Sequence, residues 1–299
     1  MTPSWLWAVF TIAAAGGQTA RNAMQRELTA RLGTVGATHV RFLFGFPFAL
    51  LFLLGVRLVG GAAFPTPNAV FLGWIAMGAL TQIGGTALML ATMETRTFVV
   101  TIAYLKTEPI IVAVLGFLFL YDALTLPMVV AILIATLGVV LISLRGGAKE
   151  SGGWKPALFG LSSGGLFAIS AIGYRGGILA LHEPNYVMAA TFALTIGLFI
   201  QATLLSAYLA LTKPSTLRAI MNLWRPSMLA GLMGAAASEG WFLAFALAAA
   251  ASVRTLGLID VLFAQITSHL IFKQKTTARE AIGIVLLIAG AVLLVWVHK

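Results

Sequence analysis

The chain contains no cysteine, and charged residues make up only 9% of its 299 residues. The absence of cysteine excludes disulfides, thiol catalysis and cysteine-ligated metal sites. Soluble domains carry about 25% charged residues, so the low charge content excludes an ordinary soluble core. The few polar groups that do occur inside apolar segments are therefore the first candidates for function.

Long apolar runs are what the sequence has in abundance, with 60% hydrophobic residues and a mean hydropathy of +0.99. A helix that crosses a bilayer needs about 20 apolar residues. Because backbone polar groups in lipid must be satisfied internally, the runs predict an all-α membrane protein of ten transmembrane helices. The first run has no basic n-region and no small-residue cleavage site, so we expect a retained helix rather than a signal peptide. The ten runs cover residues 5–22, 34–56, 69–93, 97–120, 125–144, 156–176, 186–210, 227–250, 254–272 and 279–297.

The net charge of +10 resembles that of a nucleic-acid-binding protein. The basic residues, however, lie mostly in short loops between apolar runs, which is the pattern set by membrane insertion and not by nucleic acid. Most of them follow odd-numbered runs, as do the three arginines Arg21, Arg26 and Arg31. The positive-inside rule then predicts that both termini lie outside the cytoplasm.

The segment 145–155 is rich in glycine and charge, and it separates residues 1–144 from residues 156–299. Each half contains five apolar runs, and a shift of 152 positions pairs Gly138 with Gly290 and Glu108 with Asp260. Because five is odd, the second half enters the membrane from the opposite side. The sequence therefore predicts two inverted five-helix repeats, which place a binding site near the midplane between the halves.

The string from Tyr104 to Pro109 interrupts the fourth run with a lysine, a glutamate and a proline. Each charge at the centre of a bilayer costs about 2.5 to 3.5 kcal/mol. Lys106 and Glu108 point to opposite sides of a helix, so we expect each to meet another helix or a water-filled cavity. Pro109 frees the carbonyl of Leu105 and predicts a hinge or broken helix, as transporters use. The alternative is a static bridge that fixes helix packing.

Further polar residues in the runs have two interpretations each. Arg41, with His39 nearby, could clamp a carboxylate or phosphate, or its side chain could extend to the membrane interface. Glu239 lies among small residues and could stay protonated, or it could pair with Lys106 or Arg41.

Two more positions complete the candidate site. Trp241 could line a pocket beside Glu239 or simply pack. In the ninth run, Gln265 and His269 share one helical face while Asp260 points elsewhere. Coupling through His269 is less expected than plain packing.

The acids and bases within the runs leave the charge of the substrate open. Arg41 and Lys106 oppose Glu108, Glu239 and Asp260. Ionising all three acids in a bilayer is costly, so proton exchange on one of them is a candidate coupling step and protons are expected partners. A zwitterion could engage both signs, whereas a cation would need only the acids. Under the shift Lys106 falls on Leu258, so we expect Glu108 to serve the shared machinery and Lys106 to select substrate.

Three segments resemble the ten-helix EamA-type transporters of the drug/metabolite transporter superfamily. They are Arg41-Phe-Leu-Phe-Gly-Phe-Pro47, the stretch from Glu108-Pro109 to Thr125, and Ile282-Gly283 through Gly290-Ala-Val-Leu-Leu. Two departures concern the turn after the fourth helix, where the family usually has Gly-Glu and this chain has Tyr121-Asp122, with Lys273-Gln274 in the second half. The resemblance implies transport of small metabolites, and members commonly keep both termini in the cytoplasm.

The leading hypothesis is a secondary active transporter, an exporter of small polar metabolites such as amino acids that works by alternating access. No G-x-x-x-x-G-K-[ST] string occurs, so ATP hydrolysis is unsupported. An exporter of cationic drugs or metabolites is the main alternative, followed by a lipid flippase or a membrane-embedded enzyme. No cluster of catalytic residues and no cofactor or metal motif is found, and the oligomeric state is left open.

Overall fold

The computed structural model describes residues 3–61, 63–95, 105–143, 155–263 and 277–297. Within these ranges the chain is helical and has no strand, which confirms the all-α fold class. The helices are α1 (Leu6–Gly60), α2 (Ala69–Thr95), α4 (Glu108–Leu120), α5 (Leu126–Ser143), α6 (Lys155–Ala180), α7 (Tyr186–Thr212), α8 (Pro214–Asn222), α9 (Trp224–Leu247), α10 (Ala250–Leu256) and α12 (Ala278–Val297), with a 3-10 turn η1 at Gly257–Ile259.

Helix α1 contains the first two predicted helices, joined at Gly33. Gly33 has φ 69° and ψ 172°, a backbone conformation that is essentially restricted to glycine. The predicted end of the first helix at residue 22 is wrong, because the helix continues to this glycine. No glycine or proline lies between residues 18 and 32, so nothing in the sequence stops the helix earlier. The second segment begins at Thr34, as predicted.

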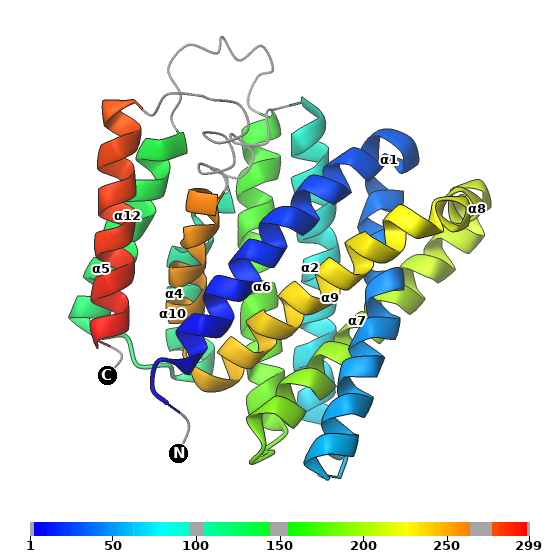
Figure 1. The fold of residues 1–299 in the computed structure, drawn as a ribbon, viewed down its shortest axis with the longest axis horizontal. Coiled ribbons are helices and arrows are strands. Elements are labelled where there is room, and N and C mark those ends of the chain that lie inside the picture. Colours follow the sequence, from blue (N-terminus) through cyan, green and yellow to red (C-terminus); the bar gives the residue numbers. More distant parts are fainter. Residues whose placement is uncertain (1–2, 62, 96–104, 144–154, 264–276, 298–299) are drawn as a thin grey trace.

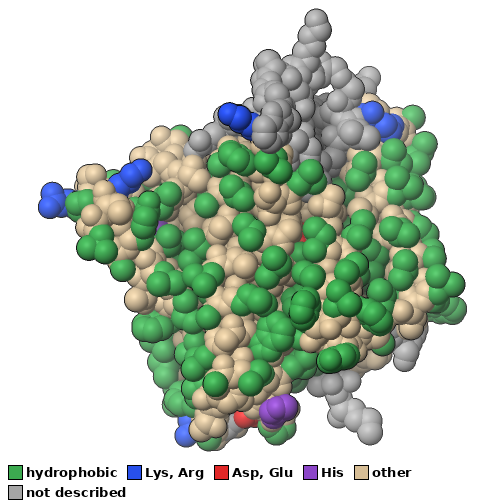
Figure 2. All heavy atoms as spheres, turned by 180° about the vertical axis from the view of Figure 1, so that it is seen from behind, with side chains coloured by type: hydrophobic (Ala, Val, Ile, Leu, Met, Phe, Trp, Pro, Cys, Tyr) green, Lys and Arg blue, Asp and Glu red, His purple; other side chains and the backbone are tan. Residues whose placement is uncertain are grey.

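Apolar helices long enough to span a bilayer occur along the whole chain. Five qualify by length and composition among the described residues, and they cover Leu6–Gly60, Ala69–Met93, Tyr186–Thr212, Trp224–Leu247 and Ala278–Val297. Figure 2 shows apolar side chains spread over the flank of the molecule, whereas coloured charged side chains gather toward its two ends. These features indicate a membrane protein. The predicted runs 97–120 and 254–272 lie only partly within the described residues.

The helices pack as close antiparallel or crossing pairs, with α1 along α9, α2 along α6 and α5 along α12. The α5–α12 contact is made by glycines. A Cβ added at Gly138 would lie 2.6 Å from the amide nitrogen of Leu287, and one added at Gly290 would lie 2.7 Å from that of Ala135. Only glycine permits this approach of two backbones, as is typical of helix packing in membranes.

Helices α4 and α10 occupy the middle of the molecule. Both lie between the α5–α12 pair at one end and the larger group of α1, α2, α6, α7 and α9 (Figure 1). Helix α10 follows α9 after only Ala248 and Ala249, so the chain turns back into the bundle at once. The short helix α8 was not among the predicted elements, because it is amphipathic and buries only Ile220. The placement of α4 and α10 decides where the charged residues meet.

Candidate functional site

A cavity of about 50 Å³ lies where α1, α2, α4, α6, α9 and α10 converge. Its walls come from both halves of the sequence, 1–144 and 156–299. A space this large holds a few water molecules, and its polar lining suits them. The charged residues that line it are Arg21, Arg41, Lys106, Glu108, Arg254 and Asp260.

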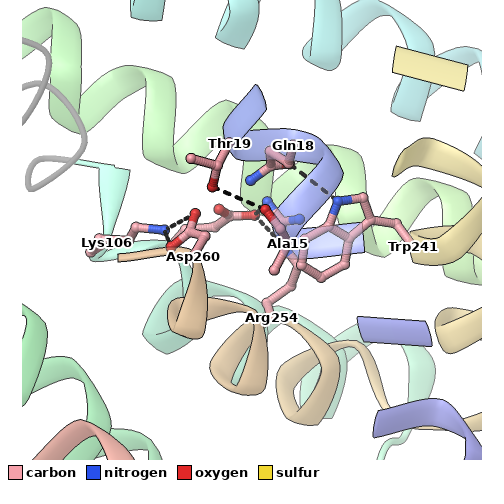
Figure 3. A network of polar contacts seen from close by, with 8 residues as sticks. Ala15, Gln18, Thr19, Lys106, Trp241, Arg254 and Asp260 are labelled. Carbon is pink, nitrogen blue, oxygen red and sulfur yellow. Dashed lines mark hydrogen bonds and ion pairs between the residues drawn. The ribbon is translucent and has the colours of Figure 1, made fainter. Parts of the chain in front are cut away.

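Two ion pairs cross this cavity, and each joins one half of the chain to the other. The ammonium of Lys106 donates to both carboxylate oxygens of Asp260 at 2.6 Å (Figure 3). The guanidinium of Arg254 donates through Nε to Oε1 of Glu108 at 2.5 Å, and its Nη2 also contacts that oxygen. Lys106 and Glu108 therefore each meet a partner from another helix, and not each other.

The start of α4 places these two residues. The described chain is helical at Leu105, turns at residues 106 and 107, and resumes as α4 at Glu108. Pro109 lies in the first turn of α4, where its missing N–H leaves no hydrogen bond unmade. A Cβ at Gly164 of α6 would lie 3.3 Å from the carbonyl oxygen of Leu105, so the glycine gives this turn room. A hinge motion at Pro109 stays a prediction.

Arg21 and Arg41 are held by neutral partners. Arg21 donates through Nη2 and Nε to Oδ1 of Asn22, at 2.8 and 3.3 Å. Arg41 donates through Nη1 to the hydroxyl of Thr86 at 3.3 Å. Both residues are buried, at 2% and 4% exposure. Unlike Lys106 and Arg254, they have no carboxylate partner among the described residues.

Aromatic side chains form the remaining wall. The Arg254 guanidinium lies 4.7 Å from the centre of the Trp241 ring, a cation–π distance. The indole N–H of Trp241 donates to Oε1 of Gln18 at 3.1 Å, which ties α9 to α1 (Figure 3). The rings of Tyr174 and Phe242 lie 4.5 Å apart. This wall fixes the orientation of Arg254 and offers apolar surface beside the charges.

A second hydrogen-bonded cluster supports the tyrosine. The hydroxyl of Tyr174 donates to Oε1 of Gln82 at 2.9 Å, and Nε2 of Gln201 donates to the same oxygen at 2.9 Å. Gln201 also donates to the Tyr174 hydroxyl at 3.0 Å. Gln82 therefore joins helices, since α2, α6 and α7 meet here.

The structure brings most of the predicted residues together and leaves some outside. Arg41, Lys106, Glu108, Trp241 and Asp260 line the cavity. Two others do not. His39 instead contacts the Ser206 hydroxyl at 3.0 Å, and Glu239 accepts from the Thr191 hydroxyl at 2.5 Å. The alternative in which Glu239 pairs with Lys106 or Arg41 is wrong, because its side chain contacts Thr191 of α7. Tyr104, Gln265 and His269 lie outside the described residues.

Two arginines of the cavity were not predicted as site residues. The sequence pattern assigns Arg21 and Arg254 to loops, because each lies at the edge of an apolar run. In the structure α1 continues well past Arg21, and α10 starts before Arg254, so both side chains are carried into the bundle. The helix-favouring residues after Arg21 were the one available signal.

The cavity offers charges of both signs on largely buried side chains. Its chemistry suits reversible binding of small ions or zwitterions, since every charged group is already within reach of another polar group. No group of three or more His, Asp or Glu that could hold a metal occurs in the described part of the chain.

Comparison with known proteins adds the fold alone. No model of a protein family matches the chain, and no curated protein sequence matches it. One solved structure, described only as a crystal structure of a protein, superposes with a TM-score of 0.67 at 12% identity. The match covers 99% of this chain and 96% of the other, so the two share one fold over their whole lengths.

Proposed function

We propose that the protein is a secondary active transporter of the ten-helix EamA type that exports small polar metabolites such as amino acids. The observation that carries the proposal is the buried charged cavity whose ion pairs, Lys106–Asp260 and Arg254–Glu108, each connect the two halves of the chain. Buried ionisable groups in a membrane protein mark substrate or ion pathways by default.

The proposed inverted repeat is supported by the helix bounds. A shift of 152 positions takes the start of α5, Leu126, to the start of α12, Ala278, and takes Thr34 to the start of α7, Tyr186. It also exchanges the packing pair α1–α9 for α6–α2, and both pairs occur.

The glycine contacts between α5 and α12 support it further. The Cβ built at Gly138 approaches the backbone of Leu287 and Gly283, and the one built at Gly290 approaches that of Ala135 and Ala131. The same shift converts the first set of contacts into the second. A pseudo-two-fold axis between α5 and α12 would produce this reciprocity.

Alternating access follows from such a design. Rocking one half against the other would change the distances across the two ion pairs, which join the first residue of α4 and the turn before it to the segment from α10 to Asp260. A charged substrate can take the place of one partner when an ion pair opens, so that the remaining partner keeps a counter-charge. Protons could do the same at Glu108 or Asp260, which is how we expect export to be coupled.

The cell inner membrane is the proposed location, with both termini outside the cytoplasm. The loop charges support this orientation even without Arg21 and Arg254, since one arginine that lines the cavity is removed from each side of the count. The resemblance to EamA-type transporters supports the opposite orientation.

Uptake into proteoliposomes tests the proposal. Purified protein would be reconstituted and offered radiolabelled amino acids, organic anions and organic cations, with and without an imposed proton gradient. We expect at least one compound to accumulate faster than in protein-free liposomes, and faster still with the gradient. If none of the compounds moves faster than in protein-free liposomes, the transporter proposal fails.

A further inference from the structure

We propose that the cavity binds the anionic group of a small organic substrate, a carboxylate or a phosphate, between Arg21 and Arg41. The inference rests on the proposed transport function, because it names the substrate class of the same cavity. The sequence alone left the sign of the substrate open, and the structure supplies the missing observations.

The charges that line the cavity do not balance. Among the described residues, four cations and two carboxylates face it, and each carboxylate already has its own cation. Arg21 and Arg41 are the surplus. Two other carboxylates inside the bundle are engaged elsewhere, since Asp122 pairs with Arg175 and Glu239 accepts from Thr191. Two buried cations without a counter-charge are costly, so an anion is the group that the site lacks.

Both arginines also have hydrogen-bond donors to spare. Nη1 of Arg21 and Nε of Arg41 are buried and have no hydrogen-bond partner in the part of the chain that the structure describes. A buried donor that is left unsatisfied costs about 1 to 3 kcal/mol, and more when the group is charged. An oxyanion in the cavity would accept from these donors and remove that penalty.

The two guanidinium groups are carried to the same place in the bundle. A Cβ at Gly234 of α9 would lie 3.4 Å from Cδ of Arg21 and 3.5 Å from Cγ of Arg41, so both side chains run across this glycine. Like charges held side by side repel, and an anion between them converts the repulsion into two attractions. Planar guanidinium forks match the geometry of carboxylates and phosphates, which lysine does not.

The rest of the wall describes the body of the substrate. Tyr174, Trp241 and Phe242 line the same cavity as the arginines. Such rings offer apolar surface to an apolar or aromatic body. In this conformation the cavity, at about 50 Å³, is too small for a ring, so a one-ring anion requires the opening that alternating access would provide. Organic anions with one ring are suitable probes, because their charge can be varied while the ring is kept.

Isothermal titration of the purified full-length protein in detergent tests the charge preference. The probes are benzoate, phenyl phosphate, benzamide and benzylamine, which share a ring and differ in charge. We expect benzoate or phenyl phosphate to bind at least about tenfold more tightly than benzamide, and benzylamine to bind least. Whichever anion binds better identifies the oxyanion. Equal or tighter binding of benzylamine, or no binding of either anion, overturns the proposal.

Variants of the two arginines test the location. We expect Arg21→Gln and Arg41→Gln each to weaken binding of the preferred anion by about tenfold or more. Arg21→Lys and Arg41→Lys keep the charge but lose the fork, so we expect intermediate losses. Arg26→Gln is the matched control, because Arg26 is an exposed arginine on the same helix. Unchanged affinity in both glutamine variants overturns the proposal. If a glutamine variant does not fold, the affinity of the corresponding lysine variant and the order of probe affinities for the wild-type protein decide whether the proposal holds.

The proposed anion site and the proposed transport function can be refuted separately. Arginine-dependent binding of an anion without uptake in proteoliposomes would refute the transport function and leave the anion site standing. Uptake of cations by a protein that binds no anion would refute the anion site and leave the transporter standing.

Discussion

Lys106 and Asp260 are both nearly buried, with 10% and 7% of their side-chain surfaces exposed. Removing one partner of such a pair leaves the other charge bare and costs about 3 to 5 kcal/mol, whereas removing both is often nearly neutral. We therefore expect Lys106→Met and Asp260→Asn each to lower the melting temperature of the detergent-solubilised protein, and the double variant to recover most of the loss.

A second set of two single variants and their double variant serves as the control for the Lys106–Asp260 pair. Asp122 pairs with Arg175 and not with Lys106. Lys106→Met combined with Asp122→Asn should thus show additive losses, as distant sites do. Additive losses for Lys106 and Asp260 would mean that their contact contributes nothing to stability.

Glu108 is the acid for which we predict the largest effect on transport. Glu108→Gln keeps the shape of the side chain but removes the charge that Arg254 faces and any proton it exchanges. Under the proposed function we expect proton-driven flux to fall by at least about tenfold, the scale of a lost charge-assisted hydrogen bond, while the amount of protein in the membrane changes little. Glu27→Gln is the matched control, since Glu27 is exposed on α1. Flux in Glu108→Gln equal to that of the control would leave Glu108 a packing residue.

The sequence identifies the residues of the site better than it identifies their partners. The cost of charge in an apolar run singles out Lys106 and Glu108, and the repeat adds Asp260. That Lys106 meets Asp260 depends on how α4 packs against the segment after α10, which no local pattern contains. Arg21 was missed because an arginine at the edge of an apolar run looks the same whether it enters a loop or continues a helix.

At the scale of elements, the α5–α12 contact is a close approach of two backbones at Gly138 and Gly290. A methyl group at either position would lie within 3 Å of backbone atoms of the partner helix. We expect Gly138→Ala and Gly290→Ala each to destabilise the protein by about 1 to 3 kcal/mol, as overpacking does, and by similar amounts because their contacts are reciprocal. Gly55→Ala, where a Cβ meets nothing within 4 Å, is the control. Thermal unfolding in detergent measures all three, and a melting temperature equal to that of the control would refute the tight contact.

The join at Gly33 depends on backbone conformation instead of packing. A Cβ at Gly33 would meet nothing within 4 Å, but its φ of 69° with ψ of 172° disfavours any other residue. We expect Gly33→Ala to destabilise the protein by about 1 to 3 kcal/mol. Thermal unfolding beside Gly55→Ala, which has the same open space and lies within a helix, isolates the backbone effect. Equal stability of the two variants would show that the bend does not need glycine.

Helix positions were largely predictable, and helix ends were less so. The starts predicted at residues 34, 69 and 186 agree with the structure, because long apolar runs locate a membrane helix with little competition. The end of the first helix was wrong, since polar residues such as Gln25 and Arg26 favour helix as well as loop. Amphipathic α8 was missed for a related reason, because a short surface helix leaves no long apolar run.

For the molecule as a whole, the distribution of charge and the position of the cavity describe a membrane protein with a polar centre. Charged side chains lie toward both ends, an apolar flank separates them, and the ion pairs are enclosed within (Figure 2). The net positive lining of the cavity and the net positive loops have different origins. The first reflects the ligand that we propose, and the second reflects insertion into the membrane.

The orientation in the membrane can be tested by cysteine labelling. Because the protein contains no cysteine, single cysteines can be introduced without first removing native ones. Thr66 is exposed in the connection after the second segment of α1, and Ser215 is exposed at the start of α8, which follows α7 at the opposite end of the bundle. The loop charges predict that Thr66 is outside the cytoplasm with both termini, and that Ser215 is inside. In intact cells we expect a membrane-impermeant maleimide to label Thr66→Cys and to leave Ser215→Cys unlabelled until the cells are lysed. The reverse labelling pattern would show the opposite orientation, with both termini in the cytoplasm as is common in EamA-type transporters. It would not change the description of the helix bundle and its central cavity.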